Sequence, residues 1–206
     1  MNLPNALTAT RIFLVPLLVV VLLTKFEGRM IFGVRKELAG AAIFGLASLT
    51  DWLDGYVARR RKQVTPLGQV MDPLADKLLT SAAFLALVQM GLAPAWMVAI
   101  IIGRELAVTA LRNRAYARGV PMPASWLGKI KMIAQVVAIL ALILGDVYLP
   151  WFLVIGSAAL WVVVALALVS AADYFRSFSG VLSTRSADIP QPADIEIVRR
   201  KDRRAG

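Results

Sequence analysis

The chain has 206 residues, of which 59% are hydrophobic and only 17% are charged, and its mean hydropathy is +0.70. A soluble globular domain averages about 45–50% apolar and about 25% charged residues, so the composition excludes an ordinary soluble domain and indicates an integral membrane protein. The net charge is +10, and the sequence contains no cysteine and no histidine, which excludes disulfides, thiolate nucleophiles, Cys/His zinc sites and histidine bases.

Six apolar segments follow one another along the chain, each about the 20 residues that a bilayer-spanning helix needs. They cover residues 6–26, 38–59, 68–90, 94–116, 126–144 and 151–175. No signal peptide is expected, because the N-terminal residues lack a basic region and a cleavage site. We therefore predict an all-α integral membrane protein, with six transmembrane helices in a catalytic domain over residues 1–178.

Basic residues at the segment ends predict the orientation. Residues 59–62 close the second segment and residues 112–118 close the fourth, whereas the turns 91–94 and 145–150 contain no lysine or arginine. Basic residues favour the cytoplasmic side. We predict both termini and the active site on the cytoplasmic face of the cell (inner) membrane. The loop between the first two segments, with four basic residues, opposes this orientation.

Residues 179–206 contain few apolar side chains and end in a basic run. Such a segment cannot bury enough apolar surface to fold alone. We expect a disordered basic cytoplasmic tail beside anionic membrane lipid. A specific partner site is the alternative. The basic residues elsewhere lie at helix ends, so nucleic acid is not an expected partner.

Four aspartates lie on the second and third segments, in the pattern Asp-x2-Asp-Gly-x2-Ala-Arg-x8-Gly-x3-Asp-x3-Asp from Asp51 to Asp76. Each membrane carboxylate costs roughly 2.5–3.5 kcal/mol, and a divalent cation would offset four of them. Asp51 and Asp54 share one helix face, and Asp72 and Asp76 share another. The short connection between the helices lets these faces converge. We expect Mg²⁺ or Mn²⁺, with two ions.

Asp76 is the candidate catalytic base, acting on a hydroxyl held close by. In the alternative, all four acids bind metal and water takes the proton. A structural ion site or an ion path is a further alternative, although the acids cluster at one depth. The small residues Gly55, Ala58 and Gly68 either clear space for a ligand or pack helices together.

The stretch from Asp51 to Asp76 resembles, without departure, the signature of the CDP-alcohol phosphotransferases. These membrane enzymes move a phosphoalcohol or phosphatidyl group from a CDP-linked donor to an alcohol. The resemblance covers about residues 1–175 and implies a homodimer. It implies metal ligands at Asp51, Asp54 and Asp72. It implies that Asp76 is the catalytic base and also contacts the metal. The residues implied in binding the CDP moiety are Gly55, Ala58, Arg59 and Gly68.

The N-terminal element Asn5-x2-Thr8-x2-Arg11 is similar to a family element close to the nucleotide and pyrophosphate of the donor. The spacing places its three residues on one side of a helix. The alternative is a helix cap followed by an arginine that snorkels to the membrane surface.

Two further stretches resemble the bacterial phosphatidylglycerophosphate synthases. They are Gly103-Arg104-Glu105-Leu106 with Arg112, and 127–131 with Lys129 and Lys131. An acceptor that carries a phosphate dianion needs cations at the membrane surface. We therefore predict acceptor phosphate contacts for Arg104, Arg112, Lys129 and Lys131. Arg104 lies deeper and either faces the site or pairs with Glu105 or another carboxylate. Positive-inside anchoring is the alternative for these cations.

Together with the cations, the resemblance implies metal-dependent transfer of the phosphatidyl group from CDP-diacylglycerol to sn-glycerol 3-phosphate. The products would be phosphatidylglycerophosphate and CMP. Two alternatives stay open: the same chemistry with inositol phosphate or another alcohol as acceptor, and a divalent-cation channel or transporter.

Overall fold

The structure is a computed structural model that describes residues 3–24, 30–31, 33–61, 66–117, 126–146 and 150–187. Side chains are described for residues 9–24, 33–50, 74–114, 128, 130–146 and 150–172. The expected tail from residue 188 onward therefore lies outside the described residues.

The described part of the chain contains six helices, close to the six predicted segments. They are α1 (Leu3–Leu23), α2 (Lys36–Arg61), α3 (Pro66–Gln89), α4 (Ala95–Ala117), α5 (Trp126–Gly145) and α6 (Pro150–Ala187). The prediction of an all-α chain omitted one small feature. Between α1 and α2, β1 (Met30–Ile31) pairs antiparallel with β2 (Val34–Arg35). Gly33 turns this hairpin at a φ of 78°, and two-residue strands are too short to show an alternating pattern.

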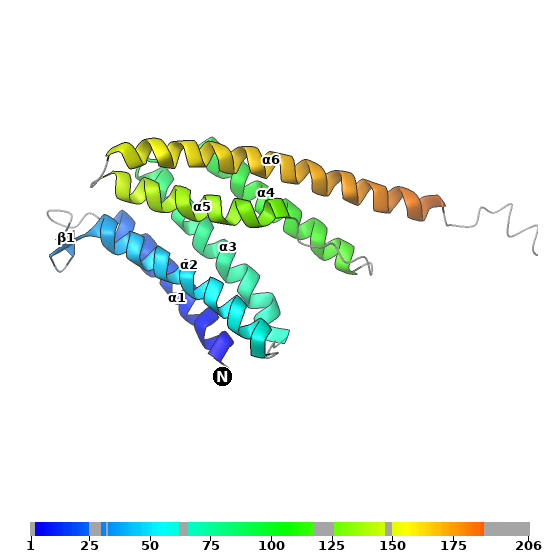
Figure 1. Cartoon of the computed structure of the whole chain (residues 1–206), viewed down its shortest axis with the longest axis horizontal. Coiled ribbons are helices and arrows are strands. Elements are labelled where there is room, and N and C mark those ends of the chain that lie inside the picture. The colour runs from blue at the N-terminus through cyan, green and yellow to red at the C-terminus, as the bar shows by residue number, and fades with distance from the viewer. Residues whose placement is uncertain are drawn as a thin grey trace, which may run out of the picture.

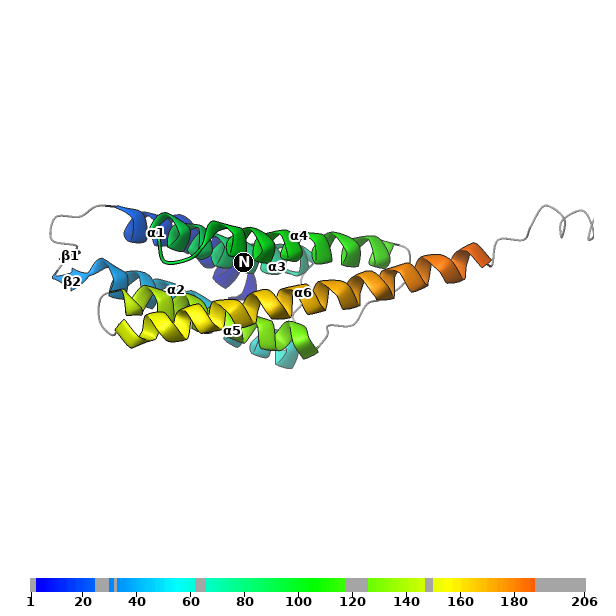
Figure 2. The ribbon, with the colours of Figure 1, turned by 90° about the horizontal axis from the view of Figure 1, so that it is seen from above.

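Consecutive helices run in opposite directions along one elongated bundle (Figures 1 and 2). We call the end that carries β1 and β2 the hairpin end, and the end where α6 finishes the tail end. The start of α1, α3 and α5 and the finish of α2 and α4 therefore face the tail end. Helix α6 lies along α5 and also contacts α4, while α1 packs against α2 and α3. Sequence-distant helices thus meet throughout the bundle.

Helix α6 is longer than predicted. Its 38 residues correspond to about 57 Å at 1.5 Å per residue, and its last turns project past the other helices (Figure 2). The sixth helix was expected to finish near residue 175, with a disordered tail from 179. That expectation is wrong for residues 179–187, which are helical. Extending an existing helix avoids the unfavourable nucleation step, so a polar segment can continue it.

Large apolar side chains fill the half of the bundle nearest to the hairpin end. We call this set the apolar core, and its largest fully buried members are Leu18, Leu22, Phe44, Leu79, Phe84, Leu87, Ile101, Ile139, Leu142, Ile143 and Leu160. Small residues let the backbones approach there. A Cβ placed on Gly156 of α6 would lie 2.7 Å from the Leu142 side chain and 3.0 Å from its backbone nitrogen. The α5–α6 contact therefore depends on glycine.

The outer surface is apolar while several charged side chains are buried. Phe13 is 75% exposed and Val154 is 71% exposed, yet Lys131 is only 3% exposed. Soluble proteins seldom expose this many large apolar side chains while burying charged ones, so the distribution fits a lipid surrounding. Among the described residues, Pro150–Ala172 of α6 is long and apolar enough to cross a bilayer, and Ala9–Leu23 and Ile130–Gly145 are shorter apolar stretches. Six membrane crossings and their orientation stay predictions.

Candidate functional site

The helices that carry the four aspartates are neighbours. Asp51 and Asp54 lie in the last three turns of α2, while Asp72 and Asp76 lie in the first three turns of α3. Because α2 and α3 are antiparallel and in contact, both pairs lie toward the tail end. The side chains of Asp51, Asp54 and Asp72 lie outside those described, so the convergence of the carboxylates stays a prediction. Gly55, Ala58, Arg59 and Gly68 also lie outside the residues whose side chains are described, so their role in binding the CDP moiety stays a prediction.

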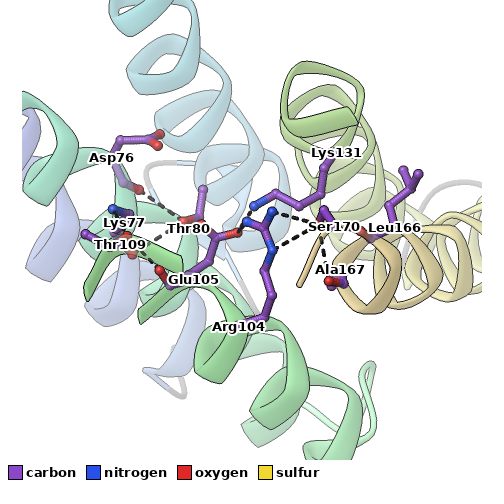
Figure 3. Close-up of polar contacts among 10 residues, drawn as sticks. All are labelled: Asp76, Lys77, Thr80, Arg104, Glu105, Thr109, Lys131, Leu166, Ala167 and Ser170. Carbon is purple, nitrogen blue, oxygen red and sulfur yellow. Dashed lines mark hydrogen bonds and ion pairs between the residues drawn. The ribbon is translucent and has the colours of Figure 1, made fainter. Parts of the chain in front are cut away.

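Asp76 is the member of this set whose side chain is described. It is half-buried, and its backbone carbonyl accepts a hydrogen bond from Thr80 Oγ1 at 3.1 Å. Its carboxylate points to the side on which Glu105 and Lys131 lie (Figure 3). It is near enough to Lys77 and Lys131 for its charge to act on both ammonium groups. Asp76 therefore borders a group of cations.

Helices α4 and α5 bring two cations together around one carboxylate. Glu105 of α4 uses Oε1 to pair with Lys131 Nζ of α5, and Arg104 Nη1 lies 3.3 Å from the same oxygen. Both cations are largely buried. Arg104 therefore pairs with Glu105, one of the arrangements expected for it, and the same carboxylate also pairs with Lys131.

Helix α6 contributes to the same group through Ser170. Arg104 donates from Nε at 3.1 Å and from Nη2 at 2.7 Å to Ser170 Oγ. One turn further along α4, Lys77 donates to Thr109 Oγ1, and Thr109 Oγ1 donates to the Glu105 carbonyl at 2.6 Å. We call Lys77, Arg104, Glu105, Thr109, Lys131 and Ser170 the polar cluster (Figure 3).

The structure brings Asp76, Arg104 and Lys131 together. The two other residues predicted to contact the acceptor phosphate are Arg112 and Lys129. Arg112 is exposed near the end of α4, where its charge acts on Lys77. The Lys129 side chain lies outside those described. Arg104 and Lys131 are also too deeply buried for simple anchoring at the membrane surface, so the positive-inside alternative does not account for these two.

In the N-terminal element, Arg11 is 2% exposed on the helix that packs against α2 and α3. This burial contradicts the alternative in which Arg11 snorkels to the surface. Helix α1 already begins at Leu3. Asn5 therefore lies inside the helix rather than at its cap. The side chains of Asn5 and Thr8 lie outside those described.

Sequence reasoning did not identify Ser170 and Thr109 as parts of the site. Ser170 is one of two serines within the longest apolar segment, and Thr109 lies one turn after Glu105. A buried hydroxyl in a membrane helix needs a hydrogen-bond partner, and that need is the available signal. A hydroxyl can also bond back to its own helix, so its position alone does not name a partner.

The sequence matches a known protein family and several of its members. A profile of the family described as CDP-alcohol phosphatidyltransferase matches residues 1–169. A Bacillus subtilis (strain 168) protein named CDP-diacylglycerol–glycerol-3-phosphate 3-phosphatidyltransferase is 48% identical over 191 residues, covering 89% of this chain and 98% of the relative. A Pseudomonas fluorescens protein of the same name is 34% identical over 184 residues, covering 86% and 90%.

A third relative of that name, from Rickettsia typhi, is 34% identical over 184 residues and is covered over 96% of its length. The profile spans α1 to α5 and most of the apolar part of α6, so it includes all four aspartates. The resemblance stated from the aspartate signature is thereby confirmed. This chain belongs to the CDP-alcohol phosphatidyltransferase family of membrane-bound enzymes.

Proposed function

We propose that this protein transfers the phosphatidyl group from CDP-diacylglycerol to sn-glycerol 3-phosphate, releasing CMP and phosphatidylglycerophosphate. The observation that carries the proposal is the 48% identity, over nearly the full length of both chains, to a relative named for this reaction. The buried cations beside Asp76 add physical support, because an acceptor that carries a phosphate needs them.

The family generally uses divalent metal ions. In this chain, Asp51, Asp54, Asp72 and Asp76 would hold Mg²⁺ or Mn²⁺, with two ions as our proposal. The donor set fits such ions, because its members are all carboxylates and the sequence has no cysteine or histidine. When bound, the metal would neutralise charge on the donor pyrophosphate and on the leaving CMP.

Asp76 acts as the catalytic base in this proposal. Its carboxylate takes the proton from the primary hydroxyl of the acceptor. The resulting oxygen attacks the phosphorus on the diacylglycerol side. A new P–O bond forms as the bond between that phosphorus and the CMP oxygen breaks. A single in-line displacement suffices, and the position of Asp76 beside the cations would keep the hydroxyl and the acceptor phosphate within one small region.

The donor would lie toward α1 and α2. Its CDP moiety would contact two sets of residues, one on α1 and one on the small-residue faces of α2 and α3. These residues are Asn5, Thr8, Arg11, Gly55, Ala58, Arg59 and Gly68. The packing of α1 against both aspartate helices and the burial of Arg11 support this placement.

The acceptor phosphate would bind at the polar cluster, with Arg104 and Lys131 as its main contacts. Three basic side chains, Lys77, Arg104 and Lys131, lie with two carboxylates, Glu105 and Asp76 (Figure 3). Basic groups gathered inside a membrane bundle favour an anionic ligand. Arg112 and Lys129 would guide the phosphate at the tail end.

We further propose a multi-pass protein of the cytoplasmic membrane, with both termini and the tail end facing the cytoplasm. Trp96 and Trp151 are exposed in the first turns of α4 and α6, at the hairpin end, and tryptophan favours the membrane interface. A catalytic domain over residues 1–178, a basic tail near anionic lipid, and a homodimer complete the proposal.

The test measures CMP release by the purified protein from CDP-diacylglycerol with Mg²⁺. Parallel reactions contain sn-glycerol 3-phosphate, inositol phosphate, or neither. Release that requires glycerol 3-phosphate and stops with a chelator supports the proposal. Release with inositol phosphate alone contradicts the acceptor. No release with either phosphate, together with Mg²⁺ flux into protein-containing liposomes, favours the channel alternative instead.

A further inference from the structure

Ser170 uses its full hydrogen-bonding capacity in one place. Its hydroxyl is 1% exposed and donates to the Leu166 carbonyl one turn earlier on α6, at 2.6 Å. A serine hydroxyl has one proton and two acceptor positions. With the proton used within α6, the oxygen accepts both Nε–H and Nη2–H of Arg104. The direction of these bonds is therefore determined.

Arg104 is held on two sides of its planar guanidinium. The Nε and Nη2 edge contacts Ser170, and Nη1 contacts Glu105 Oε1. A free arginine side chain has large rotamer freedom, and ordering it costs about 1.5–2 kcal/mol of conformational entropy. Two contacts in different directions remove this freedom before any ligand binds. The guanidinium is therefore pre-organised.

The two contacts differ in charge. Glu105 is an anion that already pairs with Lys131, whereas Ser170 is neutral. A second carboxylate at position 170 would hold Arg104 but would also cancel its charge. A hydroxyl fixes the guanidinium and leaves its positive charge available to an anion. The chemistry of Ser170 therefore suits a group that positions a phosphate-binding arginine.

We infer that Ser170 is a positioning residue for acceptor binding: its hydroxyl fixes the Arg104 guanidinium so that Arg104 can contact the acceptor phosphate. This inference rests on the proposed function. It adds a residue of α6 that lies just past the end of the family match at residue 169. Ser170 does not touch the reacting atoms.

The decisive measurement compares steady-state kinetics of Ser170→Ala with the unchanged protein in the CMP-release assay. Loss of the hydroxyl frees the guanidinium, so the KM for sn-glycerol 3-phosphate should rise by roughly 3- to 10-fold. The kcat and the KM for CDP-diacylglycerol should stay within about twofold, because the donor site and Asp76 are untouched. Inhibition by inorganic phosphate should weaken in parallel with the KM.

Two variants serve as controls. Ser157→Ala makes the same change at an exposed position on the same helix and should leave all constants unchanged. Ser170→Thr keeps a hydroxyl and should restore most of the acceptor affinity. If Ser170→Ala leaves the acceptor KM unchanged, or lowers kcat and both affinities together, the inference is wrong. If Ser170→Ala does not fold, Ser170→Thr is measured alone. An acceptor KM close to that of the unchanged protein then supports the inference, and a tenfold higher acceptor KM contradicts it.

If the proposed function itself is wrong, the CMP-release assay gives a different result from the one expected if only the role of Ser170 is wrong. In that case the unchanged protein would not release CMP in response to sn-glycerol 3-phosphate. A normal response of the unchanged protein, with no effect of Ser170→Ala on the acceptor KM, would reject the positioning role alone.

Discussion

The two halves of the bundle are held together by different interactions, apolar packing in one and polar and charged contacts in the other. Toward the hairpin end, the apolar core joins α1 through α6 with side chains such as Phe44, Phe84 and Leu142. Toward the tail end, the same helices contribute charged and hydroxyl groups, and α4, α5 and α6 meet through Arg104, Lys131 and Ser170. Each helix thus changes character along its length.

The contrast separates the part of the bundle that provides stability from the part that provides function. Lipid tails are as apolar as leucine, so apolar packing holds the helices together through close contact rather than through the hydrophobic effect. Paired charges inside the bundle are costly and are kept where chemistry needs them. We therefore expect changes in the apolar core to alter stability, and changes in the polar cluster or at Asp76 to alter turnover and acceptor binding.

The largest effect is expected for Asp76→Asn, which removes the proposed base. The kcat for CMP release should fall by about 10³-fold or more, near the upper part of the range for general-base catalysis. The melting temperature should change little, because asparagine is nearly isosteric. Asp146→Asn, in the turn after α5 at the hairpin end, is the matched control and should retain full activity. Near-normal turnover of Asp76→Asn would contradict its role as base.

Glu105→Gln should be the most destabilising change within the polar cluster. It leaves Lys131 and Arg104 as buried cations without their carboxylate, and breaking a buried pair costs about 3–5 kcal/mol. Glu105→Gln combined with Lys131→Met removes both charges and should recover part of the melting temperature. Thermal unfolding in detergent measures both. A double variant less stable than Glu105→Gln alone would show that the pair is not the cause.

Gly156→Ala tests the close contact in the apolar core. The added Cβ would meet Leu142, including its backbone nitrogen, so the protein should lose about 1–3 kcal/mol of stability. Its acceptor KM should not change. Gly103→Ala on α4 is the matched control, since nothing lies within 4 Å of a Cβ there. Equal melting temperatures for the two variants would contradict the described α5–α6 packing.

The smallest effect is expected for Lys36→Met at the hairpin end. Lys36 Nζ donates to the carbonyls of Leu22 at 3.0 Å and Thr24 at 3.3 Å, and so caps the end of α1. Its loss should lower stability by about 0.5–1 kcal/mol, because a cation near a helix C-terminus contributes about this much. Activity at low temperature should be normal. A measurable change in acceptor KM would mean that the two halves are coupled more strongly than their contacts indicate.

The amino-acid sequence by itself predicted the six helices to within a few residues at most ends, and it identified the family. Both depend on local information: the length of an apolar segment specifies a helix, and Asp51 to Asp76 form a pattern within one helical hairpin. The same local reading failed for α6 and for β1 and β2, because no periodic pattern marks a helix that continues into polar sequence or a strand of two residues.

Which side chains meet depends on how the helices pack in three dimensions. Arg104 and Ser170 are 66 residues apart, and neither the apolar character of α6 nor the motif on α4 names the other as its partner. Their contact depends on how far each helix is rotated about its axis when α4, α5 and α6 pack. The rotation of α4 and α5 likewise turns Glu105 toward Lys131, and the packing of α1 against α2 and α3 buries Arg11. Residue types and spacing therefore predicted the chemistry, whereas helix packing determined how Arg104 and Lys131 are held.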